Sequence, residues 1–226
     1  MNIDPKVLCG QTNSHIYWLE SNKLGVHRDV VEPLKKLKEA ASLAGFELSL
    51  CSAFRSFDFQ LAIWNAKASG TRPVLDSQSR LIDISKLAPR ELMYSILRWS
   101  ALPGLSRHHW GTDFDVFDLK QMPKGYQLKL VPEEFEGEGY FAPLHSWLDV
   151  NLSQFGFFRP YAQDLGGVSP ERWHISYSPL AQKYCRALKL ETIQEVISST
   201  QIQLKDSIQE ALPEIYERFF SRISSN

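Results

Sequence analysis

The sequence is poor in cysteine, has no long apolar run and carries no excess of charge of either sign. Its three cysteines (Cys9, Cys51 and Cys185) lie far apart in the chain, which argues against a disulfide framework or a thiolate zinc site. No apolar segment approaches the ~20 residues of a membrane-spanning helix. Lys and Arg number 25 and Asp and Glu 26, so there is no electrostatic basis for binding nucleic acid.

The first ten residues lack the basic start and the apolar stretch of a secretory signal peptide. Unpaired thiols also suit a reducing compartment. We therefore expect a cytoplasmic protein, with action in the periplasm or at the cell wall left open. The 226 residues suit one large domain, or one domain with an appendage, and we expect a monomer.

Hydrophobic periodicity predicts an α+β fold with a small, mainly antiparallel sheet and flanking helices. Apolar residues recur at four- and three-residue spacing between Val30 and Ala44, as on the buried face of a helix, and Asp29 with Glu32 resembles a capping box. Alternating apolar residues instead favour strands. We expect strands near 46–54, 108–119 and 172–178, and helices over 29–44, 57–69 and 89–100.

The end of the chain has the pattern of a long amphipathic helical tail, broken near 198–200 and bent at Pro213. We assign residues 1–186 to one domain and 187–226 to a helical C-terminal extension packed on the same domain. Two polar, turn-rich segments, 71–87 and 120–139, are expected to wall a cleft and to be less ordered than the sheet.

Chemically distinctive side chains gather in three segments near expected strand edges: 52–60, 106–115 and 171–174. Two imidazoles and one carboxylate, with a fourth position open, form a common catalytic zinc site. The sequence offers His174 together with a choice at each of two positions, His108 or His109 and Asp113 or Asp115.

A zinc site of this kind needs further groups for hydrolysis. Glu171, three residues before His174, is a candidate base for a zinc-activated water, whose pKa falls from about 15.7 to about 7. Arg55, at the end of an expected strand, is a candidate cation for the oxyanion that develops. Each fragment is weak alone, and spacing by itself leaves a zinc hydrolase and scattered structural residues equally open.

The three segments together resemble the signature blocks of the VanY-like D-alanyl-D-alanine carboxypeptidases. The matching patterns run Ser-x-x-Arg-Ser-x-x-x-Gln from Ser52, Ser-x-His-x-x-Gly-x-x-x-Asp from Ser106, and Glu-x-Trp-His from Glu171. These enzymes are zinc peptidases of peptidoglycan, grouped with lysostaphin-type enzymes and the hedgehog signalling domain. The resemblance covers approximately residues 26–177.

The resemblance implies a role for each matched residue. His108, Asp115 and His174 would bind one zinc ion. Glu171 would activate water and then protonate the leaving amine, and Arg55 would hold the scissile carbonyl. Three further residues would line the substrate cleft: Ser52, Gln60 and Ser106. The implied activity is release of a terminal D-amino acid, D-Ala, from a peptidoglycan stem peptide or muropeptide.

Two departures from the family pattern leave the ligand set open. Asp113 stands where the family usually has a small residue, and His109 directly follows the expected ligand. Strand alternation would put His109, not His108, on the face of Asp115. We follow the family spacing, because Gly111 can bend the strand. Asp113 is then free either to orient a ligand imidazole or, equally, to face water.

Two other functions share these sequence blocks. An endopeptidase, such as a lysin that cuts L-Ala–D-Glu, would retain the zinc chemistry and change the bond. A non-catalytic, hedgehog-like binding module would retain the zinc alone. The presence of both Glu171 and Arg55 counts against the binding module, because a structural site needs neither a base nor an oxyanion partner.

Overall fold

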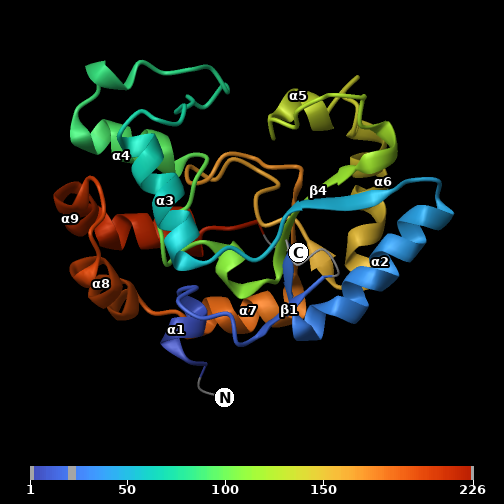
Figure 1. Ribbon diagram of the computed structural model, residues 1–226, viewed down its shortest axis with the longest axis horizontal. Helices are drawn as coiled ribbons and strands as arrows, with labels where there is room; N and C mark the ends of the chain where they lie inside the picture. Colours follow the sequence, from blue (N-terminus) through green and yellow to red (C-terminus); the bar gives the residue numbers. More distant parts are fainter. Residues whose placement is uncertain (1–2, 20–23, 225–226) are drawn as a thin grey trace.

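The structure, a computed structural model, describes residues 3–19 and 24–224, and combines a small sheet with many helices (Figure 1). The main sheet has four antiparallel strands in the order β3-β4-β6-β5, which confirms the expected fold class. The strands are β3 (Leu48–Ser52), β4 (Asp113–Asp118), β5 (Phe157–Phe158) and β6 (His174–Tyr177). In this register Asp115 lies opposite His174 on one neighbouring strand and opposite Ser52 on the other.

The central strand β4 is buried along its whole length, although three of its six residues are aspartates. Phe114 and Val116 enter a hydrophobic cluster with Leu48 and Leu50 of β3. Side chains alternate along a strand, so Asp113 and Asp115 point to the other face. The sheet therefore has one apolar face and one face that presents carboxylates.

Two long helices cover the apolar face. They are α2 (Val31–Leu43), which follows the short turn η1 (Arg28–Val30), and α6 (Ala142–Asn151), continued by η5 (Leu152–Phe155). The helix expected over 29–44 is thus present, but its expected capping box is not formed. The backbone N–H of Asp29 instead donates to Nδ1 of His27, at 3.1 Å.

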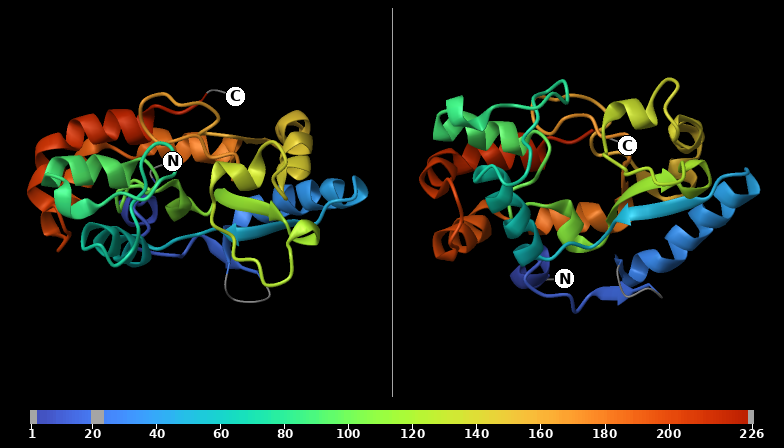
Figure 2. Two further views of the ribbon diagram at one scale, coloured as in Figure 1. Left: turned by 90° about the horizontal axis from the view of Figure 1, so that it is seen from above. Right: turned by 45° about the horizontal axis from the view of Figure 1, so that its top comes forward.

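Most of the remaining helices pack around a hydrophobic cluster of their own (Figures 1 and 2). They are α1 (Pro5–Leu8), α3 (Phe57–Ala68), α4 (Pro89–Leu97), α7 (Ser178–Ala187), α8 (Leu190–Ser199), α9 (Lys205–Ile215) and the π-helical turn η6 (Tyr216–Ser221). The C-terminal helices α8 and α9 share this cluster with α3 and α4. The indole Nε1 of Trp64 also donates to the carbonyl of Gln203, at 3.0 Å.

The smaller elements complete the surface. They are the hairpin of β1 (Ile16–Trp18) and β2 (Gly25–His27), the turns η2 (Ile84–Lys86) and η4 (Leu119–Gln121), and the short helix α5 (Pro132–Phe135). Among the described residues, none of the helices has the length and apolar character needed to cross a membrane.

Candidate metal centre

His108 reaches the sheet through a turn, not through the strand that its sequence context suggests. It lies in the 3-10 helix η3 (Arg107–Trp110), which ends at Gly111 with φ of +65°. A Cβ at Gly111 would lie 2.5 Å from Cδ1 of Ile16 and 2.8 Å from the backbone nitrogen of His27. Glycine is therefore required at this left-handed turn. Strand alternation fails for His108 and His109 because neither belongs to the strand.

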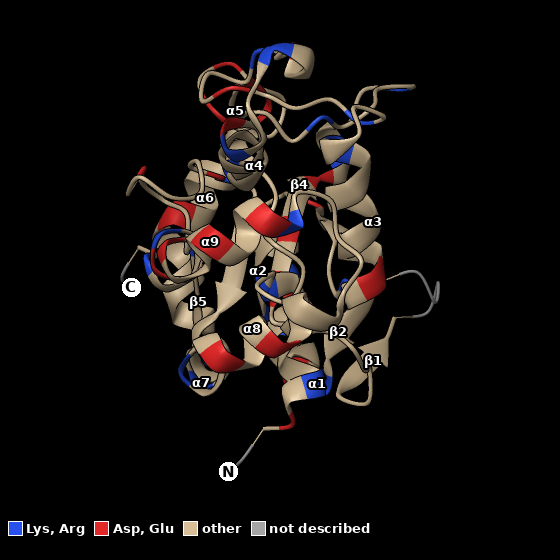
Figure 3. Ribbon diagram, turned by 90° about the vertical axis from the view of Figure 1, so that its left-hand side faces the viewer, with Lys and Arg blue, Asp and Glu red and all other residues tan. Residues whose placement is uncertain are grey.

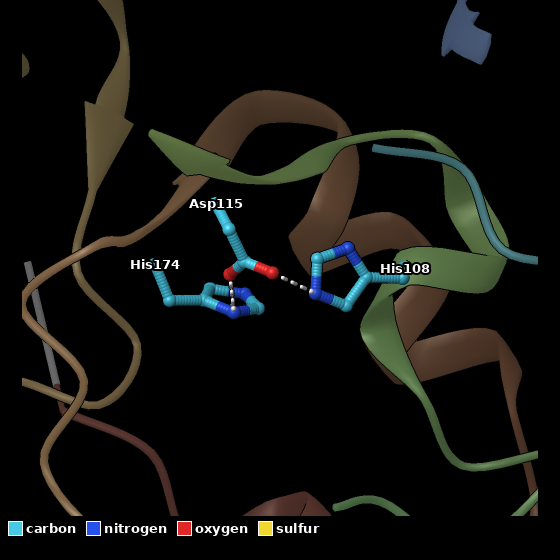
Figure 4. A group of neighbouring side chains, drawn as sticks. All are labelled: His108, Asp115 and His174. Atoms are coloured by element: carbon cyan, nitrogen blue, oxygen red, sulfur yellow. Dashed lines mark ion pairs between the residues drawn. The ribbon is translucent and has the colours of Figure 1, made fainter. Parts of the chain in front are cut away.

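The structure brings His108, Asp115 and His174 together (Figure 4). One potential ligand atom from each lies within 4.8 Å of the other two, and all three side chains are buried. Nε2 of His108 is 3.5 Å from one carboxylate oxygen of Asp115, and Nδ1 of His174 is 3.3 Å from the other. The distances and the donor types suit a divalent cation such as zinc.

Hydrogen bonds on the far side of each ring select the nitrogen that faces the centre. Nδ1 of His108 donates to the carbonyl of Ala53, at 2.9 Å, which leaves Nε2 free as a ligand. Nε2 of His174 donates to Asp113, at 3.0 Å, which leaves Nδ1 free. Ligand imidazoles in metal sites are held by hydrogen bonds of this kind.

The electrostatics of His108 and Asp115 fit a bound cation. Burial lowers the pKa of His108 to about 3, so its ring is neutral. Burial favours protonation of Asp115, but His108 and His174 outweigh it and lower its pKa to about 2. Oδ1 of Asp115 is buried and accepts no hydrogen bond from the described residues. A neutral imidazole, an ionised carboxylate and an unsatisfied oxygen are what a metal ion requires.

Asp113 is positioned to orient the ring of His174. It is fully buried and accepts four hydrogen bonds, from Nε of Arg107 (2.7 Å), Nε2 of His174 (3.0 Å), Oγ1 of Thr112 (2.6 Å) and Oγ of Ser176 (3.0 Å). Burial raises its pKa, but Arg107 and these hydrogen bonds outweigh burial and hold the pKa well below its usual range.

His109 points away from the centre and has both ring nitrogens engaged. Nδ1 donates to the carbonyl of Arg55 at 2.6 Å, and Nε2 accepts from the backbone N–H of Gly104 at 3.0 Å. Burial lowers its pKa to about 4. This neutral ring links two loops and lies outside the group of possible ligands.

Glu171 lies beside the three possible ligands. Its Oε2 is 3.5 Å from Nδ1 of His174, and its side chain is 12% exposed. The same carboxylate lines the cavity in front of the metal centre. Burial raises its pKa, which favours acceptance of a proton.

Arg55 reaches the same cavity and is held from behind. Its Nη1 donates to Oε1 of Gln60 at 2.8 Å, and its Nη2 donates to Oγ of Ser52 at 2.9 Å. Gln60 in turn donates to the carbonyl of Ala101, at 2.7 Å. Of the three expected cleft residues, only Ser106 lines the cavity, whereas Ser52 and Gln60 position Arg55.

The cavity has a volume of about 320 Å³ and polar and aromatic walls. Tyr161, whose ring centroid is 4.9 Å from that of His174, and the stacked pair of Trp99 and Trp173 belong to its lining. No pattern in the sequence pointed to Trp99, because an isolated aromatic residue usually packs in a core. The segments 71–87 and 120–139 both contribute to the walls, as their composition predicted.

Residues 23–180 match the family described as VanY, D-alanyl-D-alanine carboxypeptidase. The chain belongs to this family. The match confirms the resemblance seen in the sequence, and its range extends slightly beyond the expected residues 26–177. VanY enzymes are zinc-dependent peptidases of peptidoglycan, so the chain is a member of a hydrolase and metallopeptidase family.

Proteins of two bacteria are similar to this chain in sequence. An uncharacterized protein of Haemophilus influenzae is 37% identical over 116 residues, which cover 50% of this chain and 88% of that protein. A second protein of the same organism is 33% identical over 105 residues, or 45% and 72% of the two chains. The putative carboxypeptidase YodJ of Bacillus subtilis is 24% identical over 155 residues, which span 67% of this chain and 46% of YodJ.

Solved VanY-type structures share the fold. VanYB in complex with D-Alanine-D-Alanine aligns with a TM-score of 0.55 and 22% identity, covering 84% of this chain and 92% of VanYB. A mutant of the D,D-pentapeptidase VanY in complex with Zn(II) aligns with a TM-score of 0.52 and 19% identity, covering 87% of this chain and 92% of the VanY chain. The LD-carboxypeptidase LdcB aligns with a TM-score of 0.51 and 19% identity, covering 87% of this chain and 78% of LdcB.

Proposed function

We propose that this VanY-family protein is a zinc-dependent carboxypeptidase that removes a terminal D-amino acid, D-Ala, from peptidoglycan stem peptides. The supporting observation is that one cavity holds three candidate metal ligands, a part-exposed glutamate beside them and an anchored arginine. We propose His108, Asp115 and His174 as the ligands of one zinc ion, Glu171 as the base and Arg55 as the oxyanion partner.

Zinc would supply a Lewis acid that makes water acidic enough to lose a proton near neutral pH. Glu171 would accept this proton during attack on the scissile carbonyl, and its raised pKa suits the role. The same carboxyl would then pass the proton to the departing amine of the terminal residue. Arg55 would donate hydrogen bonds to the carbonyl oxygen as negative charge develops on it. Ser52 and Gln60 would keep the guanidinium in place.

Defined stem peptides test this proposal. The purified protein is loaded with zinc and incubated with tri-, tetra- and pentapeptide stems, and products are read by mass spectrometry with and without a chelator. We expect loss of one terminal D-Ala from the pentapeptide, abolished by the chelator and restored by zinc. Release from the tetrapeptide alone would indicate L,D-carboxypeptidase specificity, and internal cleavage or clearing of intact sacculi would indicate an endopeptidase. No release from any stem would contradict the hydrolase proposal.

A further inference from the structure

The cavity at the candidate metal centre has more positive charge than its catalytic chemistry uses. Five basic side chains line it, against the two carboxylates of Asp115 and Glu171. Arg55 already serves the proposed reaction, and Arg107 is paired with Asp113 at 2.7 Å. The three basic residues left are Lys67, Arg72 and Lys129. A divalent cation at the centre would also neutralise the two carboxylates, so these three charges have no counterpart in the cavity.

None of these three side chains forms a hydrogen bond or an ion pair of its own within the described part of the chain. Arg72 and Lys129 are exposed, but Lys67 is half-buried at the C-terminal end of α3. Burial, aided by Arg72 and Arg55 and opposed by Glu171, lowers the pKa of Lys67 to about 8. A half-buried ammonium among like charges is unfavourable unless an anion joins it. Figure 3 shows basic segments (blue) at this end of α3 and on the loop that follows.

Lys129 lies on a wall that is fixed by its own hydrogen bonds. The buried carboxylate of Glu134 accepts the backbone N–H groups of Lys129, Leu130 and Val131, at 2.7 to 3.3 Å. The hydroxyl of Tyr126 donates to the same carboxylate, at 2.7 Å. Leu130, which also lines the cavity, has a φ of +57°, an unfavourable conformation for leucine. Such a backbone persists only where its surroundings impose it.

The wall that carries Lys67 and Arg72 is also tied down. The backbone N–H of Arg72 donates to the carbonyl of Ala66, at 2.9 Å, which folds the chain back onto the end of α3. Farther along the loop that contains Arg72, the carbonyl of Asp76 accepts a hydrogen bond from the indole Nε1 of Trp99, at 2.9 Å. Cations therefore face the cavity from two separately anchored walls.

We propose that Lys67, Arg72 and Lys129 form an anion subsite that binds a carboxylate of the peptide substrate. This inference rests on the proposed function and narrows it to acidic peptides. Two sources of the carboxylate have the same chemistry: the C-terminal carboxylate next to the scissile bond, and the free carboxylate of an acidic residue farther along the stem. Either carboxylate would place a negative charge beside Lys67 and give its ammonium group an ion-pair partner.

Calorimetry on an inactive protein tests the subsite separately from turnover. Zinc-loaded Glu171→Gln is titrated with three stem peptides: the free acid, its C-terminal amide, and the peptide amidated only at the internal acidic residue. We expect the free acid to bind about tenfold tighter than one of the amides, which identifies the source of the carboxylate. Adding Lys67→Gln or Lys129→Gln should reduce that preference about fivefold, whereas Lys67→Arg should retain it.

Lys36→Gln, on the exposed face of α2 in the sheet half of the molecule, is the matched control and should leave the preference unchanged. Equal affinity for all three peptides, no measurable binding, or a preference that survives both Lys67→Gln and Lys129→Gln would overturn the inference. Failure of the proposed function appears separately, as absence of D-Ala release by the wild-type protein.

Discussion

The arrangement around His174 shows how single residues set the candidate metal centre. The ring lies between Asp113, on its Nε2 side, and the carboxylates of Asp115 and Glu171, on its Nδ1 side. Burial opposes a charge on the ring, but the three nearby carboxylates outweigh burial and raise the pKa of His174 well above 6.5. Positive charge is therefore favoured at this point, and a divalent cation would supply it.

Asp113→Asn is expected to weaken zinc binding about 10- to 100-fold, because the amide is a poorer acceptor for the ligand imidazole. Competition with a chelating dye measures the affinity. Because the change also unpairs the buried Arg107, the melting temperature is measured on the same preparation. Asp206→Asn, in the first turn of α9, serves as control. Unchanged zinc affinity in a folded Asp113→Asn protein would show that Asp113 has no part in metal binding.

Glu171→Gln is expected to retain about one zinc per chain and to lose D-Ala release by at least ~100-fold, because the amide cannot accept the proton of water. Zinc content by mass spectrometry and release from a pentapeptide stem give the two readings. An active Glu171→Gln protein would exclude Glu171 as the base.

His15 should make stability depend on pH. Burial, aided by His27 and Arg28, lowers its pKa to about 4, while its hydrogen bond to the carbonyl of His109 opposes this. The unfolded chain gains a proton near pH 6.5 and the folded chain only near pH 4, so this stabilisation is present above pH 6.5 and is lost as the pH falls towards 4. Relative to His15→Gln, wild type should lose about 1–2 kcal/mol of unfolding free energy between pH 7 and 5 in urea titrations. A constant difference would contradict a buried neutral His15.

Among the elements, the turn at Gly111 decides which histidine joins the centre. The sequence predicted a strand near 108–119, and the structure begins it at Asp113, after a 3-10 helix. Strand and helix periodicities cannot reveal so short a change of direction. The family pattern pointed to His108 where strand alternation pointed to His109.

Gly111→Ala is expected to destabilise the fold and weaken zinc binding, because its Cβ would collide with Ile16 and with the backbone of His27. Gly125→Ala is the matched control, since Gly125 also has a positive φ, of +77°, but a Cβ added there would have no other atom within 4 Å. Both should lose about 1–2 kcal/mol to the left-handed backbone. Only Gly111→Ala should lose more unfolding free energy than this and reduce zinc affinity. Equal effects of the two substitutions would mean that the contacts of Gly111 with Ile16 and His27 are unimportant.

Long elements were predictable from the sequence and short ones were not. The helix near 29–44 has an apolar face that is buried, as at Leu34 and Leu37, and the helix near 57–69 buries Trp64. The β1–β2 hairpin was missed because its residues do not alternate regularly: Tyr17 and Trp18 are both exposed in β1. The candidate ligands, base and oxyanion partner could be identified from the three sequence segments. The anchoring of Arg55 by Ser52 and Gln60 could not, because it depends on tertiary contacts.

At the scale of the whole molecule, the candidate centre lies where two hydrophobic clusters meet. Trp110 belongs to the helical cluster and Phe114 to the sheet cluster, and the chain passes from one to the other between the ligands His108 and Asp115. The cavity therefore depends on both clusters. The C-terminal helices are part of the helical one, through residues such as Ile208 and Ile215.

Ile215→Ala in α9 is expected to lower the unfolding free energy by about 2–5 kcal/mol, because Ile215 is fully buried. The tail should unfold together with the rest of the domain in a single urea transition. Val150→Ala, at a side chain that is 72% exposed, is the control and should have little effect. A separate transition for the tail would show that it folds independently of the cleft.

The central claim is that His108, Asp115 and His174 hold one zinc ion, and anomalous diffraction from zinc-soaked crystals at the zinc absorption edge tests it most directly. We expect one strong peak, about 2.0–2.2 Å from Nε2 of His108, a carboxylate oxygen of Asp115 and Nδ1 of His174. A peak on His109, or no peak among these three side chains, would contradict the account.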